Sequence, residues 1–461
     1  MSCHICTKSC TTNCCKKKPE VLFFDKPKNL EWNSGDLDET IIFDKKIKLC
    51  SKTNVNIEST ISAQTIFGDI APIVYNAYKL YVDGKLVSQA GFQPDVEQYS
   101  EENLNHIETS SLTWSGIKCC CFNVKVTAQL LRQSLFTTTT ETINPNQNEI
   151  TSDIKKEGTV GEAKGAFLRI NLLSCDSSTY FFKNNFAVWD NQHPLTLFDE
   201  TLYLNGKCKR ISVFGSIAAE IINLEPGPGP SYNTYKLYIN GDQVSAGGYT
   251  SLPFDLSQNL ETSSLIWSGK SHCSKLRIKL IAETTGKESN VNTREELYKK
   301  FNQAKGAFLS VVAEDKCDSY AFFKADPITK SWVKKDEEVT LFDDIVKVKN
   351  NISITSSIAT NINNASSFNI YRLYVNDKLV SNAGFKYTYA VPYPNLETST
   401  LIWGGKFENL YDCYFCNNRR IKVKVTAQLV DPGDNGNSNV DNSLDFFKGS
   451  KGAFLSVFSY E

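Results

Sequence analysis

The chain has 461 residues, which is about three times the size of a typical domain. Its 50 Lys and Arg residues are balanced by 51 Asp and Glu residues, so the positive excess that binds phosphate is absent and no nucleic-acid partner is expected. Aromatic residues are frequent, with 27 Phe, 20 Tyr and 6 Trp, and this composition favours strands over helices.

The N-terminal residues carry no recognisable targeting signal. Residues 1–6 lack the apolar run of about 7–15 residues that a secretory signal needs, and no segment has the roughly 20 apolar residues of a membrane span. The 15 cysteines nevertheless exceed what a protein of a reducing compartment normally uses, unless they bind metal. We therefore expect a protein that is made without a Sec signal peptide, has no membrane partner and later meets an oxidising exterior.

Residues 1–15 form a cysteine-rich arm. They contain Cys3, Cys6, Cys10, Cys14 and Cys15 and almost no apolar side chain that could pack. Such a polar segment cannot offset its own ordering entropy. We expect a flexible connector that gains structure only when its cysteines find partners.

Two sequence strings occur three times after the arm. The first string spans residues 78–92, 235–249 and 371–385, and the second spans 108–116, 261–269 and 397–405. A Lys-Gly-Ala-Phe-Leu string closes the copies at 164–168, 305–309 and 451–455. We predict three tandem β-sandwich domains at 16–173, 174–314 and 315–461.

Short strands are predicted along each copy. In the first copy, residues 55–61 alternate apolar and polar side chains over much of their length, which is the period of a half-buried strand. Residues 123–130 alternate in the same way and expose a basic stripe. Only residues 293–301 have a helical pattern.

The first repeated string is predicted to be a hairpin. Its centre is a dipeptide that suits a two-residue turn in which both residues have positive φ. The dipeptides are Asp83 with Gly84, Asn240 with Gly241, and Asn376 with Asp377.

Seven or eight short antiparallel strands per copy predict an all-β chain of three tandem jelly-roll-like β-sandwich domains. An immunoglobulin-like sandwich is the neighbouring possibility. The long final crossing before the closing strand favours the jelly roll.

No set of residues has the spacing of a catalytic site. Trp114, Trp267 and Trp403 follow a leucine at period two, which indicates the core-facing side of a strand more than a sugar-stacking platform. The histidines do not recur at equivalent positions and have no triad or metalloprotease spacing; they are His4, His106, His193 and His272. We expect no enzymatic activity, no catalytic residue and no cofactor.

The cysteines are candidates for intermolecular disulfides. A thiol recurs between the Trp strand and the basic-stripe strand of every copy, and again where copies two and three open. The candidates are Cys3, Cys6, Cys10, Cys14, Cys15, Cys119, Cys120, Cys121, Cys175, Cys208, Cys273, Cys317, Cys413 and Cys416. Zinc binding is the alternative for Cys3, Cys6, Cys413 and Cys416, but neither C-x-x-C pair has a second half-site at the expected separation.

The doublet of Cys14 and Cys15 in a short polar arm, the β-rich domain directly after it and the internal thiols resemble the layout of the endospore appendage (Ena) proteins of Gram-positive spore formers. In that family a cysteine-bearing connector precedes a jelly roll and is disulfide-linked into neighbouring subunits. The family's subunit is typically a single jelly roll, whereas this chain has three predicted domains and extra cysteines at 3, 6 and 10.

The resemblance and the repeats predict a structural, self-assembling subunit of an extracellular or spore-surface filament. Its partners would be further copies of itself, joined head-to-tail by strand complementation and by disulfides from the arm, and other spore or surface proteins. A multidomain surface adhesin or carbohydrate-binding protein is the alternative. A hydrolase is a further rival, but it would need a nucleophile or an acid pair for which the sequence offers no candidate.

Overall fold

The computed structural model describes residues 19–26, 30–33, 38–66, 74–94, 105–119, 121–132, 150–155, 161–174, 176–204, 208–222, 231–251, 258–272, 274–294, 301–315, 317–326, 331–332, 337–362, 367–386, 395–410, 419–430, 438–440 and 450–461. Within these ranges the secondary structure is strand, apart from two short 3-10 helices, η2 (Gly161–Ala163) and η4 (Phe407–Asn409). No helix in these ranges has the length and apolarity to cross a membrane. The helical pattern predicted at 293–301 lies mostly outside the described residues.

Each third of the chain forms the same set of ten strands, and we call these sets repeats 1, 2 and 3. Repeat 1 contains β1 (Glu20–Lys26), β2 (Glu31–Asn33), β3 (Thr40–Lys48), β4 (Thr53–Ile66), β5 (Val74–Val82), β6 (Lys85–Phe92), β7 (Asn105–Lys118), β8 (Cys121–Arg132), β9 (Thr151–Asp153) and β10 (Gly165–Leu172). Repeat 2 contains β11 (Ser178–Asn184), β12 (Val188–Asp190), β13 (Leu195–Tyr203), β14 (Lys209–Ile222), β15 (Ser231–Ile239), β16 (Asp242–Ser251), β17 (Gln258–Ser271), β18 (Lys275–Thr284), β19 (Glu288–Asn290) and β20 (Gly306–Asp315). Repeat 3 contains β21 (Ser319–Asp326), β22 (Ser331–Trp332), β23 (Glu338–Lys347), β24 (Asn351–Ile362), β25 (Phe368–Val375), β26 (Lys378–Lys386), β27 (Asn395–Lys406), β28 (Arg420–Val430), β29 (Ser438–Asn439) and β30 (Gly452–Tyr460).

The long strands of each repeat form two antiparallel sheets. In repeat 1 one sheet has the order β1-β10-β4-β7 and the other has the order β3-β8-β5-β6, while the short β2 and β9 extend the first sheet beside the end of β4. Repeats 2 and 3 have the same order in the corresponding strands. Eight strands in these two sheets form a jelly roll, so the predicted all-β, jelly-roll-like fold is confirmed.

The predicted hairpins are present in all three repeats. β5 and β6, β15 and β16, and β25 and β26 are each joined by a two-residue turn. Both turn residues have positive φ, at 53° and 75° for Asp83 and Gly84, and at 48° and 63° for Asn376 and Asp377. These angles explain why the sequence places Gly, Asn and Asp at the turns.

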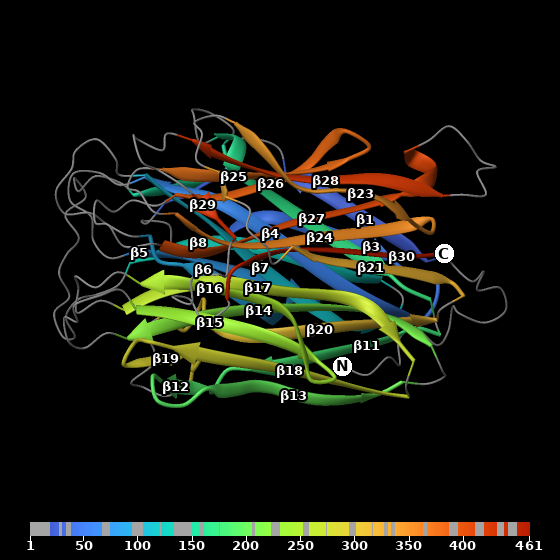
Figure 1. The fold of residues 1–461 in the computed structure, drawn as a ribbon, viewed down its shortest axis with the longest axis horizontal. Helices are drawn as coiled ribbons and strands as arrows, with labels where there is room; N and C mark the ends of the chain where they lie inside the picture. Colours follow the sequence, from blue (N-terminus) through green and yellow to red (C-terminus); the bar gives the residue numbers. More distant parts are fainter. Residues whose placement is uncertain are drawn as a thin grey trace.

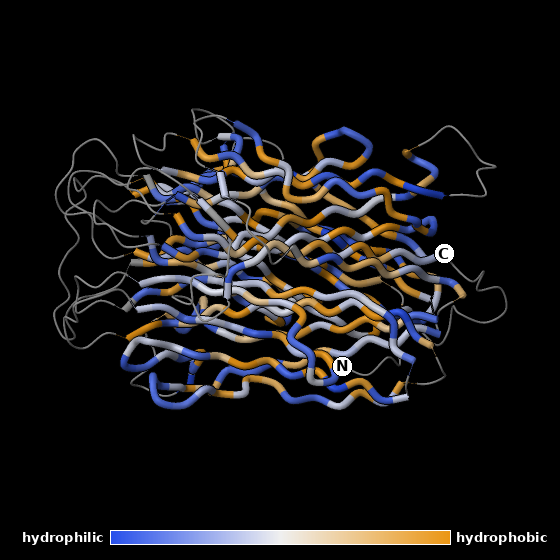
Figure 2. Tube along the Cα trace, viewed as in Figure 1, coloured by the Kyte–Doolittle hydropathy of each residue, from blue (hydrophilic) through white to orange (hydrophobic). Residues whose placement is uncertain are grey.

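The apolar side chains of the two sheets face each other and form one core in each repeat. Along β8, for example, Val124, Val126, Ala128 and Leu130 are all buried. Figure 2 shows the resulting alternation of apolar and polar residues along many of the strands. On β18 of repeat 2, Lys275 and Arg277 occupy the alternate, exposed positions, where the sequence predicted a basic stripe.

The three repeats pack side by side in a closed ring. β6 of repeat 1 contacts β17, β16 of repeat 2 contacts β27, and β26 of repeat 3 contacts β7. β7, β17 and β27 also contact one another, so they line the middle of the ring. The arrangement has pseudo-threefold symmetry, and strands of all three repeats run along the long axis of the molecule (Figure 1).

The same apolar contact closes the ring at each of its three interfaces. Tyr75 packs in one cluster with Leu260, and Tyr232 packs with Leu396. The third contact joins Phe368 of repeat 3 to Ile107 of repeat 1. Because the third contact returns to the first repeat, the head-to-tail packing of repeats ends within one chain and does not itself propagate.

Candidate functional site

The described cysteines lie in or directly beside the turns at one end of the ring, which we call the cysteine-bearing end. In repeat 1 the turn from β3 to β4 contains Cys50, and the turn from β7 to β8 contains Cys119. The strand register brings these two turns together, because Lys48 pairs with Cys121 and Thr53 pairs with Lys118. In repeat 2 the corresponding turn from β13 to β14 contains Cys208, and Cys317 precedes the first strand of repeat 3.

Hydrogen bonds between repeats show that these turns belong to the same end of the ring. The side chain of Asn54, at the start of β4, donates to the backbone oxygen of Ser177, just before β11, at 2.9 Å. The side chain of Asn351, at the start of β24, donates to the backbone oxygen of Pro19, just before β1, at 3.0 Å. The end of β30, marked by C in Figure 1, lies at this end too, since Tyr460 pairs with Asn351.

The opposite end of the ring has no cysteine in its connecting segments. In repeat 1 these segments are residues 27–39, 67–73, 93–104 and 133–164, and none of them contains Cys in the sequence. The equivalent segments of repeats 2 and 3 also contain none. The described thiols are therefore distributed with a polarity along the axis of the ring.

The structure places some of the predicted disulfide residues and leaves others outside its described ranges. Cys121, Cys208 and Cys317 belong to no disulfide in the described part of the chain, and Cys121 and Cys317 are exposed. Cys50 was not among the predicted candidates, although its turn in repeat 1 is equivalent to the turn that contains Cys208 in repeat 2. The following lie outside the described residues: Cys3, Cys6, Cys10, Cys14, Cys15, Cys120, Cys175, Cys273, Cys413 and Cys416.

A histidine accompanies one of these thiols. The Sγ atom of Cys208 lies 3.8 Å from Nδ1 of His272, which directly follows β17. An imidazole beside a thiol can accept its proton, and the thiolate is the species that attacks a disulfide. Among the described residues no carboxylate contacts His272, so the pair lacks the third group of a catalytic triad.

A buried carboxyl group fixes the segment that links repeats 1 and 2 at this end. Glu314, near the end of β20, accepts hydrogen bonds from the hydroxyl groups of Ser177 at 2.5 Å and Ser174 at 3.3 Å. Burial raises the pKa of Glu314 from 4.5 to about 7, although both serines and the charge of Lys209 lower it. The carboxyl group that holds the segment between repeats 1 and 2 therefore changes its charge near neutral pH.

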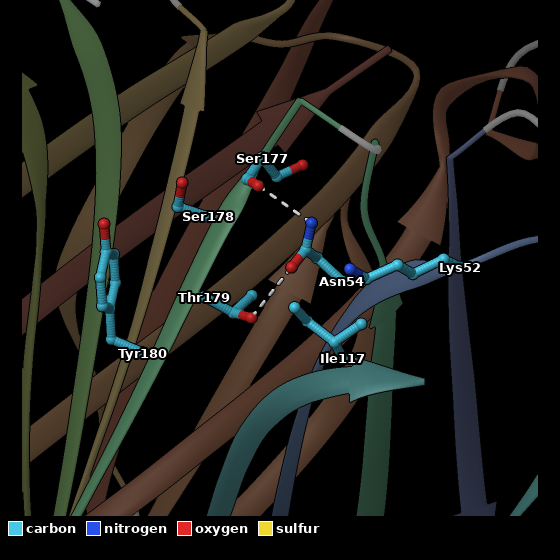
Figure 3. A pocket seen from close by; sticks show the side chains of 7 residues that line it. All are labelled: Lys52, Asn54, Ile117, Ser177, Ser178, Thr179 and Tyr180. Atoms are coloured by element: carbon cyan, nitrogen blue, oxygen red, sulfur yellow. Dashed lines mark hydrogen bonds between the residues drawn. The ribbon is translucent and has the colours of Figure 1, made fainter. Parts of the chain in front are cut away.

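One pocket lies between repeats 1 and 2 at the cysteine-bearing end (Figure 3). Its volume is about 380 Å³, and it is lined by Lys52, Asn54, Ile117, Ser177, Ser178, Thr179 and Tyr180. Within it Asn54 donates to Ser177 and accepts a hydrogen bond from Thr179 at 3.3 Å. The lining residues include no histidine, cysteine or carboxylate, so they supply neither a nucleophile with its base nor a set of metal ligands.

The tryptophans of the repeated string pack against the cores, as predicted. Trp403 is buried, and Trp114 and Trp267 are half-buried against the cores of their repeats. His106 is buried beside Glu108, and His193 is exposed near Asp190. His4 lies outside the described residues.

No protein-family profile matches the chain, and no curated protein matches it. Among solved structures, the chain is similar to dimeric latent PorU from Porphyromonas gingivalis, with a TM-score of 0.22 and 9% identity, over 79% of this chain and 32% of the PorU chain. It is similar to PNGF-II with a TM-score of 0.22 and 6% identity, over 85% of this chain and 99% of that one. It is also similar to the Macrobrachium rosenbergii nodavirus structure, with a TM-score of 0.14 and 9% identity, over 68% of this chain and 95% of that one. The chain thus spans about a third of PorU, and none of these TM-scores is high enough to bear on function.

Proposed function

We propose that this chain is a structural subunit that assembles with copies of itself into an extracellular or spore-surface filament, joined by disulfides at the cysteine-bearing end. The observation that carries the proposal is the polarity of the thiols. All described cysteines lie in or directly beside the turns at one end of a closed ring, and the segments that connect the strands at the other end contain no cysteine in the sequence. Thiols gathered on one outer face can crosslink subunits without distorting the cores.

Ring closure restricts where such a subunit can grow. The faces that join the repeats are used within the chain, so further copies must be added at the two ends or at the outer edges. The outer edge strands are β3, β13 and β23, each of which pairs with only one strand in the described part of its sheet. Each also exposes a large apolar side chain, namely Ile41, Tyr203 and Ile345. These edges are the places where strand complementation could add to the disulfide joint.

The length of the arm suits a head-to-tail joint. The 18 residues before Pro19 can span about 60 Å when extended, and a strand of 14 residues such as β4 is about 46 Å long. An arm that starts at the cysteine-bearing end of one subunit is therefore long enough to run along a stacked neighbour to the cysteines at its far end. An arm shorter than one strand would allow only contact between two cysteine-bearing ends, which closes as a dimer.

Electron microscopy of the oxidised protein tests the proposal. We expect fibres that loosen or dissociate in reductant, and a ladder of covalent oligomers in non-reducing gels. Changing Cys3, Cys6, Cys10, Cys14 and Cys15 to Ser should abolish the ladder and leave the fold intact. A matched control changes the arm residues Ser2, Thr7, Ser9, Thr11 and Thr12 to Ala and should keep the ladder.

Other outcomes would contradict the proposal in different ways. Covalent dimers without longer species would show that two cysteine-bearing ends meet and close. Fibres that dissolve in a zinc chelator and return with Zn²⁺ would show metal-bridged joints. Monomers under every condition would contradict self-assembly, and a glycan-binding assay would then test the adhesin alternative.

A further inference from the structure

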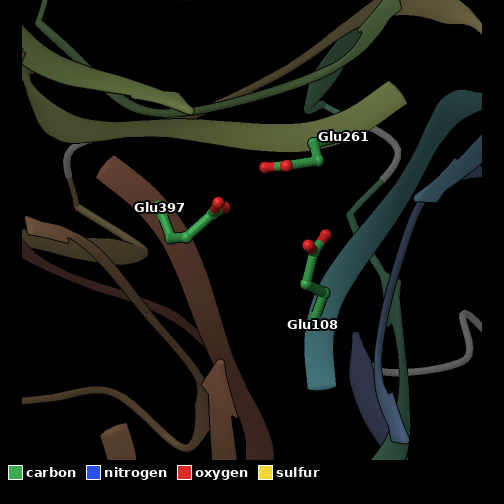
Figure 4. Close-up of side chains that lie close together, drawn as sticks. All are labelled: Glu108, Glu261 and Glu397. Carbon is green, nitrogen blue, oxygen red and sulfur yellow. The ribbon is translucent and has the colours of Figure 1, made fainter. Parts of the chain in front are cut away.

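Three glutamates from the three repeats meet on the axis of the ring. Glu108 on β7, Glu261 on β17 and Glu397 on β27 are the first residues of the second repeated string. Their side chains converge in Figure 4, and one carboxylate oxygen of each lies within 4.8 Å of the others. All three residues are buried, with at most 5% of their surface exposed.

The pseudo-threefold arrangement is what brings the carboxylates together. Each glutamate follows the apolar residue that closes a ring interface, namely Ile107, Leu260 or Leu396. Because side chains alternate along a strand, the apolar residue faces the neighbouring repeat and the glutamate leaves the opposite face of the strand. From that face the three carboxylates reach one another. The same two-residue pattern thus both closes the ring and lines its centre.

A layer of amide groups lies next to the carboxylates. Asn259 and Asn395 precede Glu261 and Glu397 by two positions, so their side chains leave the same faces of β17 and β27. The Nδ2 group of Asn259 donates to Glu261 at 2.9 Å. Both asparagines are more than nine-tenths buried, and the Oδ1 atom of each has no hydrogen-bond partner among the described residues.

Buried carbonyl oxygens without a donor are rare, because a lost hydrogen bond at such a group costs about 1–3 kcal/mol. Two of them, on the strand faces from which Glu261 and Glu397 project, point to a ligand that attracts oxygen atoms. In repeat 1 the equivalent place is taken by His106, whose Nε2 atom contacts Glu108. A divalent cation would offset most of the charge of three ionised carboxylates.

The spacing of the carboxylates suits a calcium ion. The three carboxylate oxygens are at most 4.8 Å apart, so they fit within a circle of radius 4.8/√3 Å. An ion at the centre of that circle would lie about 2.8 Å or less from each oxygen. Ca²⁺–oxygen bonds are about 2.3–2.6 Å long. A small inward movement of the side chains would complete such bonds. Mg²⁺ requires about 2.0–2.1 Å and a near-ideal octahedron, so it fits this group less well.

We propose that Glu108, Glu261 and Glu397, with the carbonyl oxygens of Asn259 and Asn395 nearby, form a binding site for one Ca²⁺ ion on the pseudo-threefold axis. The site uses one carboxylate from each repeat, so the ion stabilises the ring as a unit. It is built inside a single chain and is separate from the cysteine-bearing end. Its occupancy does not depend on filament formation.

The test uses the full chain in reductant, so that assembly does not interfere. After treatment with EDTA and dialysis, native mass spectrometry with added CaCl2 should show one Ca²⁺ per chain. Thermal unfolding should shift upward by about 3 °C when Ca²⁺ is present at 100 times its dissociation constant. Tb³⁺ should replace Ca²⁺ and give luminescence sensitised by nearby aromatic side chains.

Glutamine variants show whether these residues bind the ion. Glu261→Gln should weaken Ca²⁺ binding at least tenfold, and the change of all three glutamates to Gln should abolish both the bound ion and the thermal shift. The triple variant keeps the side-chain shape and removes the mutual repulsion, so it is expected to fold. Asp242→Asn, at the exposed start of β16, is the matched control and should bind Ca²⁺ like the unchanged chain.

Two results would overturn the proposal. One is the absence of a bound ion and of a thermal shift in the unchanged chain with Ca²⁺, Mn²⁺ and Mg²⁺ at millimolar concentrations, which would show that the carboxylates share protons. The other is wild-type Ca²⁺ affinity in the triple variant, which would place the ion elsewhere. Both readouts come from the reduced monomer, so neither depends on whether filaments form.

Discussion

The indole of Trp267 lies over the α-carbon of Gly269, two residues further along the same face of β17. A Cβ atom added at Gly269 would lie 2.2 Å from Cζ2 of the indole. The same relationship holds for Trp114 with Gly116 and for Trp403 with Gly405, at 2.4 and 2.3 Å. The Trp-x-Gly pattern of the second repeated string therefore makes room for a flat indole against the sheet.

Gly269→Ala is expected to displace this indole. The added methyl group overlaps the ring, and overpacking of this kind typically costs about 1–3 kcal/mol. Chemical denaturation and tryptophan fluorescence would measure the loss and the ring movement. Gly215→Ala on β14 is the control, because its Cβ would meet its nearest neighbour at 3.4 Å, and it should leave stability unchanged or raise it by up to about 1 kcal/mol. Equal losses in the two variants would contradict the role of Gly269.

An arginine joins repeats 1 and 3 through a fully buried guanidinium group. Arg169 on β10 donates to the backbone oxygens of Ile354 at 2.5 Å and Trp403 at 2.8 Å, and it forms an ion pair with Glu58. Repeat 3 has Ser456 paired with Thr355 at the positions of Arg169 and Glu58. The ion pair is therefore not required by the jelly roll itself.

Arg169→Ser should destabilise the chain by about 3–5 kcal/mol, because it leaves the charge of Glu58 buried without its cation. The double variant Arg169→Ser with Glu58→Thr copies repeat 3 and should recover more than half of that loss. Urea denaturation of the two variants makes the comparison. A double variant no more stable than the single one would show that the loss comes from the hydrogen bonds to repeat 3 and not from the unpaired carboxylate.

The buried carboxyl group of Glu314 predicts a dependence of stability on pH. Its pKa is raised from 4.5 to about 7, chiefly by burial, so the folded chain binds the proton more tightly than the unfolded chain does. This contribution to stability is complete below pH 4.5 and is lost as the pH rises through 7. Glu314→Gln should match the unchanged chain at pH 5 and exceed its stability at pH 8 by up to about 3 kcal/mol.

Thermal unfolding across this pH range tests the role of Glu314. Asp318→Asn is the matched control, since Asp318 is an exposed carboxylate in the turn that follows β20. It should keep the pH dependence of the unchanged chain. If Glu314→Gln keeps that dependence too, another group is responsible for it.

The sequence was sufficient to predict the elements that depend on neighbouring residues. Asp83 with Gly84 has the backbone preference of a two-residue turn, and alternation in strands such as β8 shows which side chains face a core. These local signals occur three times, and a long connection precedes the closing strand of each copy. Together they supported the prediction of three jelly-roll-like units. The strand order in the structure agrees with that fold.

The sequence did not show how the repeats meet. Glu108, Glu261 and Glu397 stand at the start of a repeated string, and a shared acid in a string that has no other charged residue was a signal for a common role. Their proximity follows only from closure of the ring, which depends on contacts between distant strands such as β26 and β7. In the same way, the recurrence of thiols was visible, but the strand register was needed to place them at one end.

His272 should shield Cys208 in the folded, reduced chain. The Nδ1 atom of the imidazole lies 3.8 Å from Sγ of the half-buried thiol, so the ring restricts the approach of a disulfide or an alkylating agent. His272→Ala should speed alkylation of Cys208 by about 2- to 3-fold, since access is one of the factors that set the rate of thiol attack. Mass spectrometry of peptides after timed alkylation gives the rate at each cysteine. Cys317 is an internal control, because it is exposed in another turn and its rate should not change. A uniform acceleration at both positions would indicate a general loosening of the cysteine-bearing end, and an unchanged rate at Cys208 would show that His272 does not cover the thiol.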